Sequence, residues 1–311
     1  MADECPGTFE MIRAYGLLAM VAPLVISTAV AVIVTGGFDR LGLLFAAVVG
    51  FSIHVSMNVY NDIYDTKQGC DTLESGQSMF SGGSAVIVKY PELEGKMFTI
   101  ARAGLVVGFL GTLGLLYISE RDMWPLFIFL FLAAAFLSKY YTAGPFKFAY
   151  RGLGEIVVWL GFGPFAILLY AAAQGIPFHP MVVSIMPITG LSTLIFAWGG
   201  EMVDMPCDRK AGKRGLVLRM GLKNSIYGLL ILHALLIANV VFAAYLFTNG
   251  WILLLAMVPY LLLLPKIFAL LTAGLENGEQ IYEGARLNFF SQPNPLNMVK
   301  SSIKKILIIL P

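Results

Sequence analysis

The sequence predicts an all-α integral membrane protein, built as a bundle of eight to nine transmembrane helices. Of its 311 residues, 58% are hydrophobic and only 13% are charged, which is more apolar and less charged than a soluble domain. Apolar stretches of about 20 residues recur along the whole chain, and each can cross a hydrocarbon core of roughly 30 Å as a helix. The net charge of +2 gives no support for nucleic-acid binding.

Eight stretches are long enough to be predicted as spanning helices. They lie near residues 13–36, 41–61, 97–118, 123–141, 153–174, 180–200, 224–248 and 251–273. A ninth span over residues 298–311 is too short to cross unless the residues before it contribute. No low-complexity linker interrupts the chain, so we expect residues 1–311 to form a single transmembrane domain.

Lysine and arginine are unevenly distributed between the predicted spans. They gather in the loops after the second, fourth and sixth spans, whereas the opposite side has only Arg40 and Arg121. Because cytoplasmic loops carry the excess of Lys and Arg, we expect the basic loops and the N-terminus to face the cytoplasm. The sequence therefore predicts a multi-pass protein of the cell membrane.

Two acidic clusters lie at the predicted cytoplasmic ends of the second and sixth spans. The first contains Asn58, Asn61, Asp62, Asp65 and Asp71, and the second contains Asp204 and Asp208. The first four are three or four residues apart and share one helix face, and Gly69 permits a turn that brings Asp71 back. Acids beside a bilayer are costly to hold, so two matched clusters predict a functional site that opens toward the cytoplasm.

The side-chain chemistry of the clusters favours Mg²⁺, which prefers oxygen ligands and is usually completed by substrate phosphates. Neither cluster contains histidine, and Cys70 and Cys207 are only neighbours of the acids, so a zinc site is disfavoured. Basic residues such as Lys213 follow the second cluster and suit a polyanionic ligand. Solvated helix caps are the competing interpretation, which a single aspartate would favour but two matched clusters do not.

The chain resembles the UbiA superfamily of intramembrane prenyltransferases, and within it the 1,4-dihydroxy-2-naphthoate prenyltransferases of menaquinone synthesis. The first motif reads Asn-Asp-Ile-Tyr-Asp-Thr-Lys-Gln-Gly-Cys-Asp over 61–71, and the second reads Asp-Met-Pro-Cys-Asp-Arg-Lys-Ala-Gly-Lys over 204–213. Between them, the segments at 141–145, 151–155 and 162–164 resemble those of the quinone-precursor branch. Most of the chain is covered by this resemblance.

The resemblance implies a helical bundle around a central cavity, in which Mg²⁺ ions hold the diphosphate of a polyprenyl donor. It implies transfer of the polyprenyl group to an aromatic acceptor, such as 1,4-dihydroxy-2-naphthoate, by diphosphate ionisation and electrophilic aromatic substitution. The implied metal ligands are Asn61, Asp62, Asp65, Asp71, Asp204 and Asp208. The implied catalytic residues are Asp65, Asp204, Asp208, Lys147 and Glu155. The implied substrate-binding residues are Asn58, Asn61, Lys67, Tyr141, Arg209, Lys213 and Arg214.

Departures from the family pattern leave other interpretations open. Glu201 stands where many naphthoate-type members have asparagine, so the acceptor could instead be a phenolic, phenazine or porphyrin ring, or a glycerol-phosphate lipid precursor. A cation-coupled transporter is the alternative from another class, but its acids would be expected near the bilayer midplane rather than at span ends. We expect His54, one turn before Asn58, to be a helix-packing histidine.

Overall fold

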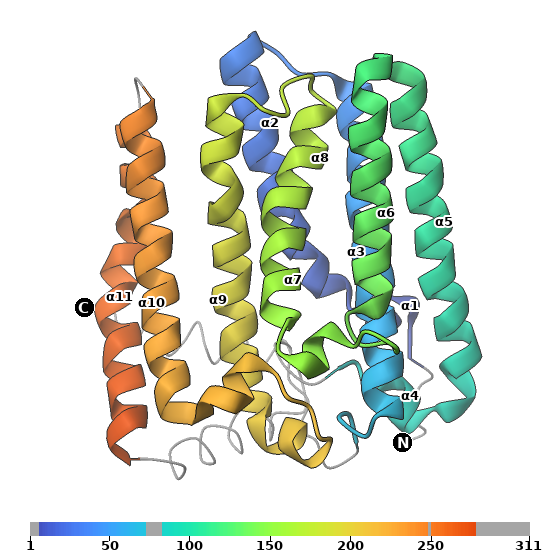
Figure 1. The fold of residues 1–311 in the computed structure, drawn as a ribbon, viewed down its shortest axis with the longest axis vertical. Helices are drawn as coiled ribbons and strands as arrows, with labels where there is room; N and C mark the ends of the chain where they lie inside the picture. The colour runs from blue at the N-terminus through green and yellow to red at the C-terminus, as the bar shows by residue number, and fades with distance from the viewer. Residues whose placement is uncertain (1–5, 73–82, 248–249, 278–311) are drawn as a thin grey trace.

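A computed structural model describes residues 6–72, 83–247 and 250–277, and within these ranges the chain forms helices and no strand. The long helices stand roughly side by side and form one bundle (Figure 1). Their bounds are α2 Val21–Thr35, α3 Arg40–Lys67, α5 Glu94–Ile118, α6 Trp124–Tyr140, α7 Gly154–Leu160, α8 Ala166–Ala172, α9 Pro180–Lys210, α10 Leu216–Leu246 and α11 Trp251–Asn277. Two short helices, α1 Thr8–Met11 and α4 Val86–Lys89, lie outside the spans.

Seven helical stretches among the described residues are long and apolar enough to cross a membrane. They coincide with the first seven predicted spans, which confirms the all-α membrane fold. The predicted span 251–273 coincides with α11, whose apolar stretch Trp251–Lys266 is shorter than the other seven. The predicted ninth span, 298–311, lies outside the described residues.

Helix α3 packs closely along α5, and small residues make this approach possible. Gly104, Gly108 and Gly111 of α5 face the side of α3 that carries Ser52 and Ser56. The Ser56 hydroxyl donates a hydrogen bond of 2.7 Å to the Ala101 carbonyl of α5. Small residues and interhelical hydrogen bonds are what hold helices together in lipid, where apolar burial gives little driving force. This contact fixes α3, the helix that carries the first acidic motif.

The fifth span is a broken helix. Between α7 and α8, residues Gly161–Phe165 form a π-helical turn that contains Pro164. Gly163 in this turn lies against Gly190 of α9, where a Cβ atom added to Gly163 would come within 3.0 Å of the Gly190 Cα atom. The π-turn therefore rests on α9 and sets the direction of the Phe162 side chain.

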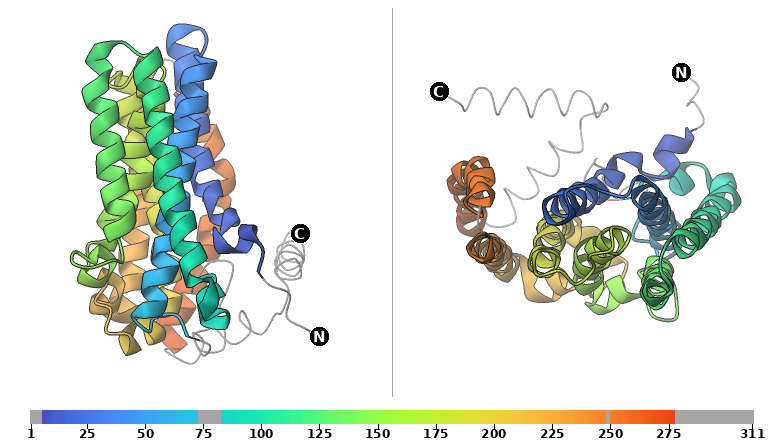
Figure 2. Two further views of the ribbon diagram at one scale, coloured as in Figure 1. Left: turned by 90° about the vertical axis from the view of Figure 1, so that its right-hand side faces the viewer. Right: turned by 90° about the horizontal axis from the view of Figure 1, so that it is seen from above.

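The last helices are joined to the bundle through α9. Trp198 of α9 donates a hydrogen bond of 2.9 Å to the Ser225 carbonyl of α10, and His233 of α10 is hydrogen-bonded to Tyr260 of α11. Helix α10 is kinked at Gly221, whose φ of 74° is in the left-handed region. Figure 2 shows α10 and α11 standing at one side of the bundle.

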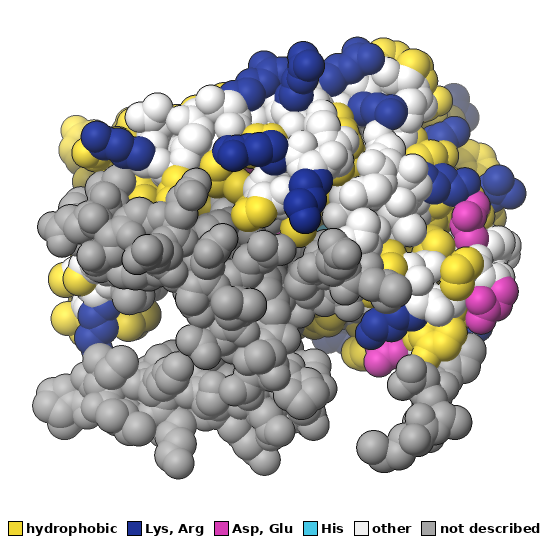
Figure 3. All heavy atoms as spheres, turned by 90° about the horizontal axis from the view of Figure 1, so that it is seen from below, with side chains coloured by type: hydrophobic (Ala, Val, Ile, Leu, Met, Phe, Trp, Pro, Cys, Tyr) yellow, Lys and Arg dark blue, Asp and Glu magenta, His cyan; other side chains and the backbone are white. Residues whose placement is uncertain are grey.

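Both acidic motifs lie at the same end of the bundle, the lower end in Figure 1. This arrangement follows from topology, because α3 and α9 run in the same direction and each motif occupies the last turns of its helix. Figure 3 views the molecule from this end and shows Lys and Arg side chains spread over it, with Asp and Glu at one edge. The acids of the motifs are thus placed beneath a largely basic surface.

Candidate active site

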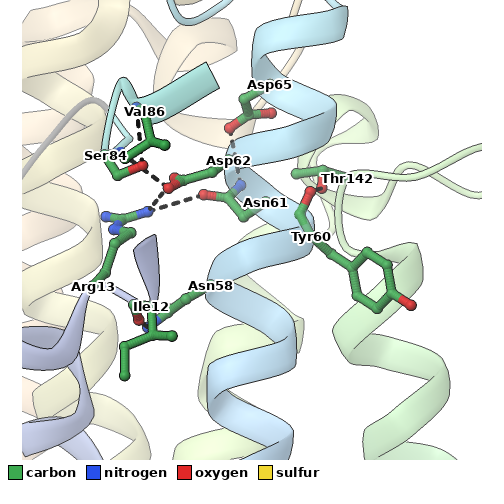
Figure 4. Close-up of polar contacts among 10 residues, drawn as sticks. All are labelled: Ile12, Arg13, Asn58, Tyr60, Asn61, Asp62, Asp65, Ser84, Val86 and Thr142. Atoms are coloured by element: carbon green, nitrogen blue, oxygen red, sulfur yellow. Dashed lines mark hydrogen bonds and ion pairs between the residues drawn. The ribbon is translucent and has the colours of Figure 1, made fainter. Parts of the chain in front are cut away.

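The first motif occupies the last turns of α3, as the spacing predicted (Figure 4). The Asn61 side-chain amide donates a hydrogen bond of 2.9 Å to Asp65 Oδ2. After the helix ends, Gly69 takes a left-handed φ of 74° and the chain turns back. The amides of Cys70 and Asp71 then both donate to the Asp65 carbonyl, at 2.9 and 3.4 Å. The predicted return of Asp71 at this glycine is confirmed.

Asp62 is the meeting point of three chain segments. Its Oδ1 atom lies 3.3 Å from the guanidinium of Arg13, which comes from the segment before the first span. Its Oδ2 atom accepts a hydrogen bond of 3.1 Å from the Ser84 amide. The carboxylates of Asp62 and Asp71 both face the Cα atom of Gly83, and a Cβ atom there would lie 2.7 Å from Asp62 Oδ1 and collide with Asp71. A glycine at this position leaves room for both acids.

The second motif meets the first through one direct hydrogen bond and through Tyr150, which contacts both. The Cys70 thiol, beside the first motif, donates a hydrogen bond of 2.9 Å to Asp208 Oδ1. Lys213 Nζ lies 3.4 Å from the same Asp208 oxygen. The Tyr150 hydroxyl donates a hydrogen bond of 2.8 Å to Asp65 Oδ1, and its ring lies 5.6 Å from Lys213 Nζ. The two motifs, distant in the sequence, therefore form one site.

The charges of this site differ from those of free side chains. Burial, together with nearby Asp65 and Asp62, raises the pKa of Asp71 to about 8. Although burial alone lowers the pKa of Lys213, the carboxylates of Asp65 and Asp208 raise it well above its usual value. Burial also raises the pKa of the Cys70 thiol, which therefore stays protonated and can donate to Asp208. Without a bound cation, Asp71 is therefore largely protonated at neutral pH, whereas Lys213 stays cationic.

A second pair of acids lies beside the motifs. Glu155, at the start of α7, is buried, and its Oε1 atom accepts a hydrogen bond of 2.7 Å from the Leu216 amide. Its Oε2 atom is buried with no hydrogen-bond partner among the described residues. Glu201 of α9 lies close by, since a Cβ atom on Gly215 would be 3.7 Å from Glu201 Oε2 and 3.8 Å from Glu155 Oε1. An unpartnered carboxylate oxygen of this kind is costly unless a ligand satisfies it.

The structure separates the predicted substrate-binding residues into two groups. Near the acids lie Asn58, Asn61, Tyr141 and Lys213, and Lys147, which was predicted as a catalytic residue, lies with its Nζ atom 5.9 Å from the Tyr150 ring. The other three predicted substrate-binding residues have different surroundings. Lys67 forms an ion pair of 2.7 Å with Glu94 of α5, and the side chains of Arg209 and Arg214 are exposed. Asp204 lies on α9 one turn before Asp208 and is partly buried.

Four contributors to the site were not predicted from the sequence, namely Arg13, Cys70, Tyr150 and Ser84, and Cys70 had been taken only as a neighbour of the acids. Arg13 is far from both motifs in the chain, and no local pattern connects it to them. Tyr150 belongs to a segment between two predicted spans, where an aromatic residue has many possible roles. Ser84 acts through its backbone amide, which any residue supplies. These roles become visible only in the folded structure, where segments distant in the sequence lie against one another.

The residues present fit a magnesium site. Within the described residues, no three carboxylate, histidine or cysteine side chains surround one point as a complete metal cage. Mg²⁺ does not require such a cage, because it is usually held by one or two carboxylates, waters and substrate phosphates. The carboxylates of Asp62, Asp65, Asp71 and Asp208 are buried, whereas the ion pairs described for them use only Arg13 and Lys213. Four buried acids with two paired cations suit a divalent cation, which would favour the ionised form of Asp71.

An apolar cleft opens into the bundle beyond the polar site. Its empty volume, counted to its open mouth, is about 640 Å³. It is lined mainly by α3, α6 and the broken fifth span, including Ile53, His54, Leu137, Phe162 and Leu169. The cleft and the acids therefore share α3 as a common wall.

Comparison with known sequences finds relatives that are all named as prenyltransferases or as proteins with a prenyltransferase domain. Residues 20–280 match the UbiA prenyltransferase family. A 2-carboxy-1,4-naphthoquinone phytyltransferase of Synechocystis sp. is 27% identical over 205 residues, which cover 65% of this chain and 62% of that protein. The 1,4-dihydroxy-2-naphthoate octaprenyltransferase of Bacillus subtilis is 26% identical over 223 residues, covering 70% and 67%. The human UbiA prenyltransferase domain-containing protein 1 is 28% identical over 229 residues, covering 70% and 62%.

A solved structure shares the fold. A UbiA homolog from Archaeoglobus fulgidus, bound to DMAPP and Mg²⁺, superposes with a TM-score of 0.60 at 15% identity and covers 85% of this chain and 84% of its own. The aligned stretches span less than two thirds of the Synechocystis and human relatives. The match to the family, in contrast, covers residues 20–280, which is most of this chain. With its two acidic motifs and its helical bundle, this chain belongs to the UbiA prenyltransferase family.

Proposed function

We propose that this protein is a membrane prenyltransferase that moves a polyprenyl group from its diphosphate to an aromatic acceptor. The proposed acceptor is 1,4-dihydroxy-2-naphthoate or a similar quinone precursor, as in the named activities of two relatives. The observation that carries the proposal is the contact between Cys70 and Asp208, which joins the two acidic motifs into one site. We further propose that residues 1–311 act as one domain.

The side chains of the site suit an ionising diphosphate. When bound, Mg²⁺ would neutralise the charge that gathers on the departing diphosphate, with Asn61, Asp62, Asp65, Asp71, Asp204 and Asp208 as the proposed ligand set. Lys213, which stays cationic, and Lys147 are proposed to bind phosphate oxygens that the metal does not cover. Tyr150 and Asn61 hold the Asp65 carboxylate in place from opposite oxygens. Preorganised charges of this kind need no rearrangement during the reaction.

The apolar cleft suits the polyprenyl tail. An allylic cation must be kept from water, and the cleft walls offer aliphatic and aromatic side chains with few polar groups. Because the cleft begins along α3, a diphosphate at Asp65 would place its attached chain against this wall. Glu155, with one unpartnered oxygen, and Tyr141 are proposed to position the acceptor beside the site.

The proposed location and orientation in the membrane follow from the distribution of Lys and Arg residues. The motifs lie at the end of the bundle whose loops carry most of the Lys and Arg among the described residues, and Figure 3 shows these side chains spread over that end. Because such residues are enriched in cytoplasmic loops, we propose a multi-pass protein of the cell membrane whose site opens toward the cytoplasm. Soluble diphosphate products would then be released into the cytoplasm.

The test is turnover by purified protein in detergent or liposomes with Mg²⁺, a panel of polyprenyl diphosphates and several aromatic acids, with products detected by mass spectrometry. Asp65→Ala and Asp208→Ala are each expected to lower turnover by at least about 100-fold, because each removes a charge that holds the diphosphate. Asp122→Ala, at an exposed position at the other end of the bundle, is the control. Full turnover in both site variants would contradict the proposal.

A further inference from the structure

His54 of α3 is buried, with only 7% of its surface exposed, and it lines the apolar cleft. Its Nδ1 atom has no hydrogen-bond partner among the described residues. Leaving a buried polar atom unpaired costs about 1–3 kcal/mol, and such atoms are rare in folded proteins. A histidine that served only to pack helices would be expected to have its nitrogens satisfied. An unpaired Nδ1 atom on a residue that lines the cleft is compatible with a ligand contact there.

The position of His54 on α3 connects the cleft to the acidic site. His54, Asn58, Asn61 and Asp65 are separated by four, three and four residues, so they lie on one face of the helix. The Asn58 side chain is within hydrogen-bonding reach of the imidazole, which leaves Nδ1 as the nitrogen without a partner. At 1.5 Å of rise per residue, His54 is about 16 Å along the axis from Asp65 and about 6 Å from Asn58. A diphosphate at Asp65 and Asn61 would thus place its reacting carbon near the depth of Asn58, one turn from His54.

The side chains around the His54 imidazole are suited to contact a flat aromatic ring. The His54 ring meets the Phe162 ring edge to face, with centroids 4.9 Å apart and planes at 80°. Phe162 belongs to the π-helical turn Gly161–Phe165, a kind of irregularity that occurs frequently at functional sites. The other hydrogen-bonding side chain in the cleft lining, the Ser138 hydroxyl, already donates to the Ala135 carbonyl at 2.9 Å. Among the described lining side chains, His54 is therefore the one that offers an unpaired polar atom.

We propose that His54 binds a ring hydroxyl of the aromatic acceptor and so selects hydroxylated rings at the junction of cleft and diphosphate site. This inference rests on the proposed function and adds a specificity-determining residue to it. A polyprenyl tail has no polar group that could satisfy the imidazole, whereas a hydroxylated ring does. A site built to hydrogen-bond a hydroxyl discriminates strongly against an analogue that lacks it, because its own polar group is then left unpaired.

The test compares His54→Leu with His54→Gln, which keeps a side-chain hydrogen-bonding group. For a hydroxylated naphthoate, His54→Leu is expected to lower kcat/KM by about tenfold or more through a higher KM, whereas His54→Gln recovers a large part of it. The KM for the polyprenyl diphosphate is expected to stay unchanged in both variants. With the hydroxyl replaced by a methyl ether, wild type is expected to lose about tenfold while His54→Leu loses little. A merely structural role would not produce this interaction between variant and substrate.

A binding measurement separates this proposal from the proposed function. Titration of the hydroxylated naphthoate into protein holding Mg²⁺ and a non-ionising thio-diphosphate analogue requires no turnover. Binding is expected to weaken about tenfold in His54→Leu but not in His54→Gln, even if no product ever forms. Equal binding by wild type and His54→Leu would overturn the role of His54. A loss of diphosphate-analogue affinity in His54→Leu, with acceptor affinity unchanged, would instead assign His54 to the donor and also overturn the proposal.

Discussion

At the scale of single residues, the site depends on a few hydrogen bonds that hold carboxylates in fixed directions. Both oxygens of Asp65 are occupied, one by Tyr150 at 2.8 Å and the other by Asn61 at 2.9 Å. Asp208 shares one oxygen between the Cys70 thiol and Lys213. Groups that orient a metal-binding carboxylate commonly affect metal affinity almost as much as the ligands themselves.

Tyr150→Phe is expected to weaken Mg²⁺ activation about tenfold or more, because Asp65 loses the donor that fixes one of its oxygens. The measurement is prenyl transfer as a function of Mg²⁺ concentration. Tyr117→Phe removes the hydroxyl of a residue that is 91% exposed and serves as the control. An unchanged Mg²⁺ dependence in Tyr150→Phe would show that the hydrogen bond does not contribute to the site.

The sequence predicted the residues whose neighbours are local. The spacing of Asn61 and Asp65 on one helix face was sufficient to foresee their contact, and Gly69 was sufficient to foresee the turn. Arg13 and Tyr150 could not be predicted, since each reaches the acids across a large sequence separation. Lys67 shows that a position within the motif is not enough to predict a contact with the site, because its side chain pairs with Glu94 of α5.

At the scale of elements, the contact between α3 and α5 determines where the first motif stands. A Cβ atom added to Gly104 would collide with the Ser56 hydroxyl and lie 2.7 Å from the Ser52 carbonyl oxygen. The two helices can therefore approach only because α5 has no side chain at this point. The same α3 wall continues into the cleft, so its placement affects both parts of the site.

Gly104→Ala is expected to destabilise the protein by about 1–3 kcal/mol, because α5 must move away from α3. Gly95→Ala, on the same helix, is the matched control, since a Cβ atom there has no neighbour within 4 Å. Alanine at that helical position is expected to be neutral or to stabilise by about 0.5–1 kcal/mol. Thermal unfolding of both variants in the same detergent provides the comparison. Equal melting temperatures would contradict the close packing.

The segment before α4 supports a second prediction. In Gly83→Ala, the new methyl group would meet the carboxylates of Asp62 and Asp71, which must then separate. We expect Mg²⁺ activation to weaken about tenfold or more, while the melting temperature in the absence of Mg²⁺ changes little, because the atoms nearest the new methyl group belong to the two carboxylates and not to the apolar core that contains Val86 and Ile87. Prenyl transfer across a Mg²⁺ titration measures this effect. Wild-type activation would show that the two acids do not act together at this glycine.

At the scale of the whole molecule, the bundle brings two distant motifs to one end and aligns them across a shared site. The hydrophobic pattern predicted seven of the spans well, because a membrane imposes a long apolar stretch on every crossing. The pattern could not predict the π-helical turn in the fifth span or the kink at Gly221, which arise from packing between helices. It also could not predict the cleft, whose walls come from several spans.

Because the site joins both halves of the bundle, its ligands are expected to stabilise the whole fold. A polyprenyl diphosphate with Mg²⁺, at about 100 times the dissociation constant, would add about 2.7 kcal/mol to the free energy of unfolding. The measurement is the apparent melting temperature with both ligands, with each alone, and after chelation. In Asp208→Asn the shift is expected to vanish, whereas Asp122→Asn, at an exposed position, keeps it. A shift of equal size in Asp208→Asn would place the ligand elsewhere.

The ion pair between Arg13 and Asp62 has a consequence for how the protein is made. Arg13 leaves the ribosome before Asp62, so this buried acid has its partner as soon as the second helix enters the membrane. At typical rates of synthesis, Lys213 follows roughly 8 to 30 s later. During that interval Asp62 can already be paired with Arg13, whereas the cation beside Asp65 has not yet been made. We expect the first two helices to insert without waiting for the second motif.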